Sequence, residues 1–195
     1  MKLAIAVIDM LVDNLKTGKH AAVEREGMAI VPALVALLRK CRAAGIPVIF
    51  ANDSFLPGDA IFESRLQPHS LRGTLGASVI PELTPQPGDH TLPKRRFSAF
   101  YKTDLDQTLH TLGVDTLAVT GITTNFCVLS TALDALQHDF NTVIVEDVCA
   151  APMPEVHQSC LALYRKTVLW PRLRVATAEA LQNAWEQGSW GPSGS

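Results

Sequence analysis

The sequence predicts an α/β fold, namely a three-layer α/β/α sandwich with a mostly parallel, Rossmann-like central sheet. First, short runs rich in Val and Ile alternate with longer segments whose apolar residues recur at helical spacing. Second, the strand-like runs are apolar without interruption, as expected where helices cover both faces of a parallel sheet. The 195 residues suit a single domain, expected at 1–187, followed by a flexible tail at 188–195.

The first strand is predicted at residues 3–9 and the second at residues 46–52, because each is a short apolar run. Between them, residues 28–44 carry apolar groups at helical spacing. Proline fits best in the first turn of a helix, so Pro32 places the start of this helix near Val31.

Residues 53–90 interrupt this alternation and are rich in Pro and Gly. A segment of this length inside a compact domain is usually a functional loop that covers a site. The rest of the chain resumes the alternation. It is predicted to form helices at 105–112, 125–138, 154–165 and 177–187, and strands at 115–122, 141–147 and, more briefly, 167–170.

Composition excludes several classes of partner and location. The net charge of −2 and an isoelectric point near 6.3 give no electrostatic basis for binding nucleic acid or a membrane surface. The apolar N-terminus contains Asp9 and lacks a small-residue cleavage site, so it is interpreted as a core strand rather than a signal peptide. Four cysteines without CxxC spacing favour a reduced, cytoplasmic protein in which a special cysteine is reactive rather than bridged.

The carboxyl ends of parallel strands are where such sheets bind ligands. Asp9 ends the first predicted strand, and Cys127 lies at the turn between the third strand and its helix. A thiol in a first helical turn is favoured as thiolate, and the unpaired N–H groups there can bind an oxyanion. A buried core cysteine and a capping aspartate remain the structural alternatives for these two residues.

A cation near this edge would complete a nucleophile, base and orienting group. Several basic residues precede the 105–112 helix, and a solvated basic surface is the structural alternative for all of them. Spacing does not choose among Lys94, Arg95, Arg96 and Lys102.

Three motifs read together resemble the isochorismatase-like cysteine hydrolases. They are VIDM, K-x-x-x-S-A-F followed by TDLDQTLHTLGVDTLAVTGITTNFCV, and TALDAL with VIVEDVCA. The resemblance covers roughly residues 3–165 and implies Asp9, Lys94 and Cys127 as the catalytic residues. It also implies a cis peptide bond between Ile122 and Thr123, with the N–H groups of Thr123 and Cys127 forming an oxyanion hole.

The family includes nicotinamidases, N-carbamoylsarcosine amidases, and ureidoacrylate and biuret hydrolases. The resemblance therefore implies hydrolysis of a C–N bond in a small amide, carbamoyl or ureido compound through a thioester, without a cofactor. One alternative is an isochorismatase-type enol-ether hydrolase, which needs no thiol; another is a non-catalytic binding or assembly subunit of the same fold. Because members commonly assemble, a homodimer or homotetramer is expected.

One departure from the family concerns metal binding. Nicotinamidases of the family bind a metal through an Asp-x-His pair after the second strand and a later His. Here Asp53 is present, Phe55 replaces the first His, and His69 matches the later one. Two ligands are fewer than a stable metal site normally uses, so the sequence predicts no metal.

Four residues are candidates for binding substrate: Asn52, Asp53, His69 and Phe126. Asp53 and His69 are expected to hydrogen-bond each other or the substrate. The structural alternative is a turn cap for Asn52, a loop anchor for His69 and core packing for Phe126. The remaining histidines, including His20 and His157, have no carboxylate or histidine neighbour at ligand spacing and are not predicted to act.

Overall fold

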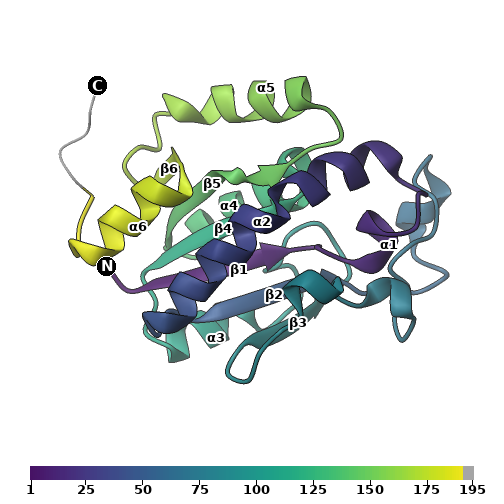
Figure 1. Ribbon diagram of the computed structural model, residues 1–195, viewed down its shortest axis with the longest axis horizontal. Helices are drawn as coiled ribbons and strands as arrows, with labels where there is room; N and C mark the ends of the chain where they lie inside the picture. The colour runs from purple at the N-terminus through teal and green to yellow at the C-terminus, as the bar shows by residue number, and fades with distance from the viewer. Residues whose placement is uncertain (191–195) are drawn as a thin grey trace.

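A computed structural model describes residues 1–190 and shows a six-stranded sheet in which every neighbouring pair of strands is parallel (Figure 1). The strand order is β3-β2-β1-β4-β5-β6. The predicted α/β class and mostly parallel sheet are confirmed. The strands are β1 (Leu3–Ile8), β2 (Val48–Asp53), β3 (His90–Lys94), β4 (Thr116–Ile122), β5 (Asn141–Ala150) and β6 (Leu173–Ala176).

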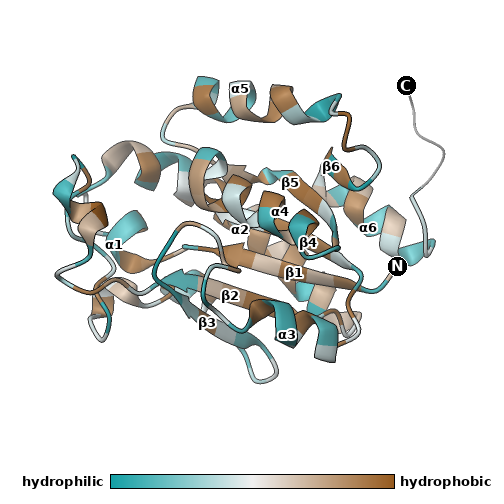
Figure 2. Ribbon diagram, turned by 180° about the vertical axis from the view of Figure 1, so that it is seen from behind, coloured by the Kyte–Doolittle hydropathy of each residue, from teal (hydrophilic) through white to brown (hydrophobic). Residues whose placement is uncertain are grey.

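Helices cover both faces of the sheet (Figures 1 and 2). Along β1, alternate side chains enter opposite layers, because successive residues of a strand point to opposite faces. Ile5 and Val7 pack with α2 (Ala21–Ala43) and α6 (Ala178–Glu186). Ala6 and Ile8 belong to the layer of α3 (Leu105–Thr111), α4 (Leu129–Gln137) and α5 (Pro154–Arg165). Among the described residues, no helix has the length and hydropathy to cross a membrane.

The start of the first long helix was predicted wrongly. Helix α2 begins at Ala21, well before Val31, and contains Pro32 in its interior. An interior proline costs about 3 kcal/mol, so packing of the extra turns must outweigh it. One such contact is at Gly27, which is buried against Leu15 of the short helix α1 (Val12–Leu15). A Cβ at this position would lie 2.5 Å from the Leu15 side chain, so the added turns of α2 pack closely on α1.

The last strand was also misplaced. Residues 167–170 form an exposed turn in which Val168 is 98% exposed, and the strand follows at Leu173–Ala176. The apolar run at 167–170 therefore faces solvent, whereas Leu173 enters the core. The predicted flexible tail, residues 188–195, is described only to Trp190. The Trp190 ring packs against the α2 layer, and the Arg174 guanidinium lies over it.

Strand β3 was not predicted, because its sequence HTLPK is short and contains Pro93. Proline is tolerated at a sheet edge, and β3 is the edge strand. Between β2 and β3 the chain makes three short 3-10 turns. Its first part lies beside α1, beyond the carboxyl ends of the strands (Figure 1), and the rest returns to the amino end of β3, where Asp89 pairs with Arg42 of α2. We call residues 54–89 the covering segment.

Candidate active site

Three charged side chains meet because three neighbouring strands end together. Asp9 directly follows β1, while Asp53 and Lys94 are the last residues of β2 and β3 and are paired in register. The Lys94 ammonium donates to Asp9 Oδ2 at 2.8 Å and to Asp53 Oδ1 at 2.5 Å. The Asp53 N–H donates to Asp9 Oδ1 at 2.7 Å. We call these three residues the charged cluster; all of them are buried.

The backbone at Asp9 is in the left-handed region, with φ of 53°. Aspartate tolerates this conformation better than most residues, at a cost of roughly 1–2 kcal/mol. Two hydrogen bonds hold it: the Asp9 carbonyl accepts from Asn14 Nδ2 at 2.9 Å and from the Leu11 N–H at 2.8 Å. The turn therefore fixes the direction of the carboxylate at the end of β1.

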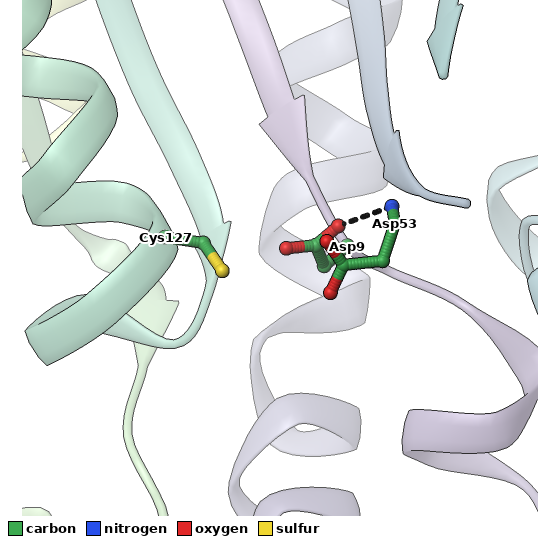
Figure 3. Close-up of side chains that lie close together, drawn as sticks. All are labelled: Asp9, Asp53 and Cys127. Carbon is green, nitrogen blue, oxygen red and sulfur yellow. Dashed lines mark hydrogen bonds between the residues drawn. The ribbon is translucent and has the colours of Figure 1, made fainter. Parts of the chain in front are cut away.

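Cys127 reaches the cluster from the other side, on a π-helical turn at Thr124–Val128. The Val128 N–H donates to Thr123 O at 3.2 Å, which closes the wide turn before α4 begins at Leu129. The sulfur points toward the two carboxylates (Figure 3), and Sγ and one oxygen each of Asp9 and Asp53 lie within 4.8 Å of one another. The Ile122–Thr123 peptide bond is cis.

Close approach of β4 to β1 brings Cys127 near Asp9. Gly121 has φ of 98°, and a Cβ at this position would lie 2.2 Å from Ile8 O, the carbonyl just before Asp9. Only glycine permits this contact without a backbone shift. The glycine thus sets the spacing between the strand that leads to Cys127 and the strand that leads to Asp9.

Burial and the neighbouring charges together shift the pKa values of Asp53 and Lys94. Burial raises the pKa of Asp53 to about 7; the Asp9 charge adds to this rise, and Lys94 opposes it. Although burial alone would lower the pKa of Lys94, the carboxylates of Asp53 and Asp9 raise it well above its usual value. The cluster therefore holds a permanent ammonium beside two carboxyl groups, and Asp53 is partly protonated near neutral pH.

Burial also raises the pKa of the Cys127 thiol well above its ordinary value, against the opposing charge of Lys94. The nearby carboxylates of Asp9 and Asp53 add to this rise. The expectation that a helix terminus keeps this sulfur as thiolate is therefore not supported. The thiol is the resting form, and a base must take its proton before the sulfur can attack.

A cavity of about 380 Å³ opens onto Cys127, Asp9 and Asp53. The covering segment contributes Phe55, Ile61, Ser64, Leu66 and His69 to its lining. We call the large apolar side chains that enclose it the apolar wall. They are Phe55, Ile61, Leu66, Phe97 and Phe126.

The structure separates the predicted substrate-binding residues. Asp53, His69 and Phe126 line the cavity, as does Thr123. Asn52 does not; it lines a separate surface hollow beside β3, to which Asp53 also contributes. His69 does not bond Asp53 but donates from Nδ1 to the Gln67 carbonyl at 2.9 Å.

Two histidines that were not predicted to act lie at the site. His20 lines the cavity, with its ring 5.3 Å from that of His69. His157 of α5 lies behind the nucleophile turn, with Nδ1 2.8 Å from the buried Thr124 hydroxyl. Neither contact joins residues close in sequence, so spacing carried no signal for either.

The side chains do not fit a metal ion. Asp9, Asp53 and Cys127 have the right proximity, but the Lys94 ammonium already bonds both carboxylates and repels a cation. Phe55 stands where the resemblance implies the first of the two metal-binding histidines, and its ring packs edge-on against His69, with centroids 5.4 Å apart. The chemistry of this site therefore has to come from its side chains.

Comparisons with known proteins agree with the resemblance. A family profile described as the isochorismatase domain matches residues 3–175. Ureidoacrylate amidohydrolase RutB of Methylobacterium radiotolerans is 30% identical over 186 residues, covering 85% of this chain and 70% of that protein.

Two solved structures share the fold along nearly the whole chain. An isochorismatase-like hydrolase from Alkaliphilus metalliredigens has a TM-score of 0.83 at 35% identity, covering 95% of this chain and 100% of the other. N-carbamoylsarcosine amidase from Thermoplasma acidophilum has a TM-score of 0.79 at 31% identity, covering 92% and 98% respectively.

Proposed function

Because the chain belongs to the isochorismatase family of hydrolases, we propose that it cleaves a C–N bond of a small amide, carbamoyl or ureido compound, with Cys127 as nucleophile. One observation carries the proposal. The thiol, a carboxylate and an ammonium come from three distant parts of the sequence and converge at the end of one cavity. A purely structural role gives no reason to bury this combination, since each charged group is costly to remove from water.

In the first half-reaction Asp9 accepts the thiol proton and the Cys127 sulfur attacks the carbonyl carbon. The N–H groups of Thr123 and Cys127 receive the oxyanion that forms. The C–N bond then breaks as Asp9 returns its proton to the leaving nitrogen, and an acyl thioester remains. The Lys94 ammonium, which donates to Asp9 Oδ2, holds this carboxylate in position between the transfers.

In the second half-reaction Asp9 takes a proton from water, and the resulting hydroxide adds to the thioester carbonyl. The C–S bond breaks, the acid or carbamate is released, and the sulfur recovers a proton from Asp9. One carboxylate thus acts alternately as base and acid.

The test is an ammonia-release screen over primary amides, carbamoyl amino acids and ureides, with pyruvate release from isochorismate measured in parallel. Ammonia release that is absent in Cys127→Ala, together with a covalent acyl adduct on Cys127 seen by mass spectrometry after acid quench, is expected. Turnover that survives in Cys127→Ala, or pyruvate release without ammonia release, would contradict the proposal.

A further inference from the structure

We propose that this cavity selects uncharged amides or ureas with an apolar body and rejects those that carry a carboxylate close to the scissile group. This inference rests on the proposed function and names the substrate class of the same site. It is drawn from the charges and surfaces that a bound molecule would meet beyond the reacting bond.

The first observation is the sign of the charged groups at the cavity. Among the described residues that line it, none is Lys or Arg, whereas Asp9 and Asp53 both are carboxylates. Lys94 lies behind them with no exposed side-chain area, and its ammonium is bonded to both. A substrate carboxylate would therefore meet like charge, and no ammonium or guanidinium among the residues that line the cavity.

Nearby arginines are already paired. Arg95 and Arg96 both contact Asp59, which also accepts the Leu56 N–H at 2.8 Å. Arg72 donates to the Ser54 hydroxyl at 3.0 Å. These contacts hold the covering segment, and none of the three arginines lines the cavity.

The second observation is the apolar wall. The Phe97 and Phe126 rings lie 5.4 Å apart, and each is partly exposed, at 38% and 52%. Across the cavity, Phe55 packs edge-on against the His69 ring. Exposed aromatic surface beside a nucleophile is what an apolar substrate body would cover, because burying it removes apolar area from water.

His20, at the edge of the wall, does not supply the missing positive charge. Burial and the neighbouring His69 lower the pKa of His20, so its ring is neutral at neutral pH. His69 uses Nδ1 to donate to Gln67 O. These rings offer hydrogen bonds and edges for packing to a polar but uncharged substituent.

Cations occur only farther out among the described residues near the cavity. Lys19 and Arg65 line a neighbouring hollow that shares His20 and Leu66 with the cavity edge. Lys19 Nζ is 3.6 Å from Asp13 Oδ1 and is thus partly neutralised. A carboxylate attached close to the amide would stay inside the cavity and would not reach Lys19 or Arg65 in the neighbouring hollow. The exclusion therefore applies to small acids whose carboxylate lies close to the scissile bond.

The experiment compares matched pairs that differ by one charge. 4-Methylbenzamide is paired with 4-carbamoylbenzoate, and propylurea with N-carbamoylglycine, and kcat/KM is measured by ammonia release. Within the pair that is hydrolysed, the neutral member is expected to be preferred at least about tenfold, since unpaired like charge is strongly disfavoured in a closed site. Equal or faster turnover of the acid would overturn the inference and leave the proposed function standing.

Binding to Cys127→Ala, measured by calorimetry with the same compounds, separates the two claims. At least about tenfold tighter binding of the neutral members supports the inference even if the wild-type protein hydrolyses none of them, in which case the proposed function fails alone. Tighter binding of the acids, or no binding of any neutral member, overturns the inference.

A charge placed on the wall provides a matched control. Phe126→Lys should reduce the preference for the neutral member at least about fivefold, because it brings a cation to the cavity mouth. Phe126→Leu removes the same ring without adding charge and should keep the preference. A ratio that moves equally in both variants would show that the ring rather than the charge balance sets it, and would overturn the inference.

Discussion

The carboxylates of the charged cluster and the side chains of the apolar wall line the same cavity but are positioned by opposite means. The cluster lies at the ends of adjacent parallel strands, and strand register fixes Asp53 beside Lys94. The wall comes largely from a segment of short 3-10 turns, and its Phe126 ring is half-exposed. The difference indicates that the sheet positions the chemistry, whereas the covering segment and nearby rings decide which molecule reaches it.

The strongest test of this division removes groups beside the reacting bond. Cys127→Ala should reduce turnover to background, and Asp9→Asn should lower kcat by about 10²–10⁴-fold, because the proposed mechanism passes every proton transfer through Asp9. Steady-state kinetics on the best amide would measure both, with thermal unfolding to confirm folding. Activity of Asp9→Asn within about tenfold of wild type would contradict its role as base.

The second prediction contrasts the stability of the two regions. Lys94→Met leaves two buried carboxylates without their cation, so the free energy of unfolding should fall by about 3–5 kcal/mol. Phe126→Leu, at an exposed position of the wall, should change it by only about 0.5 kcal/mol. Urea denaturation measures both. Adding Asp53→Asn to Lys94→Met should recover part of the loss, and failure to do so would show that the charge imbalance is not its cause.

The sequence anticipated the two regions unequally. Asp9 and Cys127 were identifiable because each directly follows an apolar run or its turn, where parallel sheets bind ligands. Lys94 needed the family resemblance, because the HTLPK run does not look like a strand until an edge position accommodates Pro93. Asn52 was assigned to the substrate because a list of strand-end residues ignores which face each one occupies.

The wall was less predictable for a physical reason. The sequence indicated that 53–90 would cover the site, but short turns without a repeating hydrogen-bond ladder leave no periodicity from which to place each side chain. His20 shows the limit: it meets His69 through the packing of the covering segment beside α1, and nothing near either residue in sequence encodes the contact.

The third prediction uses pH to contrast carboxylates from the two regions. The pKa of Asp53 is raised to about 7 by burial, so its protonated form favours the fold. This contribution is fully present below its unfolded-state pKa and is lost as pH rises toward 7. The stability of Asp53→Asn relative to wild type should therefore increase between about pH 4 and pH 7, as measured by urea denaturation at each pH.

Asp59 gives the opposite sign and serves as the control. Hydrogen bonds from Arg95 and from the Leu56 N–H lower the pKa of Asp59, so its contribution is present above the unfolded-state pKa and lost as pH falls. Asp59→Asn relative to wild type should show no slope across the window in which Asp53→Asn changes. A slope of the same sign in both variants would mean that a general charge effect is being measured.

The smallest expected effect concerns a contact outside the cavity that should nevertheless affect chemistry. Burial lowers the pKa of His157, so its neutral ring can accept a hydrogen bond from the Thr124 hydroxyl at neutral pH and brace the turn that carries Cys127. Losing one such bond is worth about 0.5–1.5 kcal/mol, so Thr124→Val should lower kcat about two- to tenfold with little change in KM, while Thr124→Ser should retain it. Steady-state kinetics of the two variants measures this effect. A rise in KM without a change in kcat would show that the turn affects substrate binding only, whereas a lower kcat would show that the His157 contact from α5 supports catalysis.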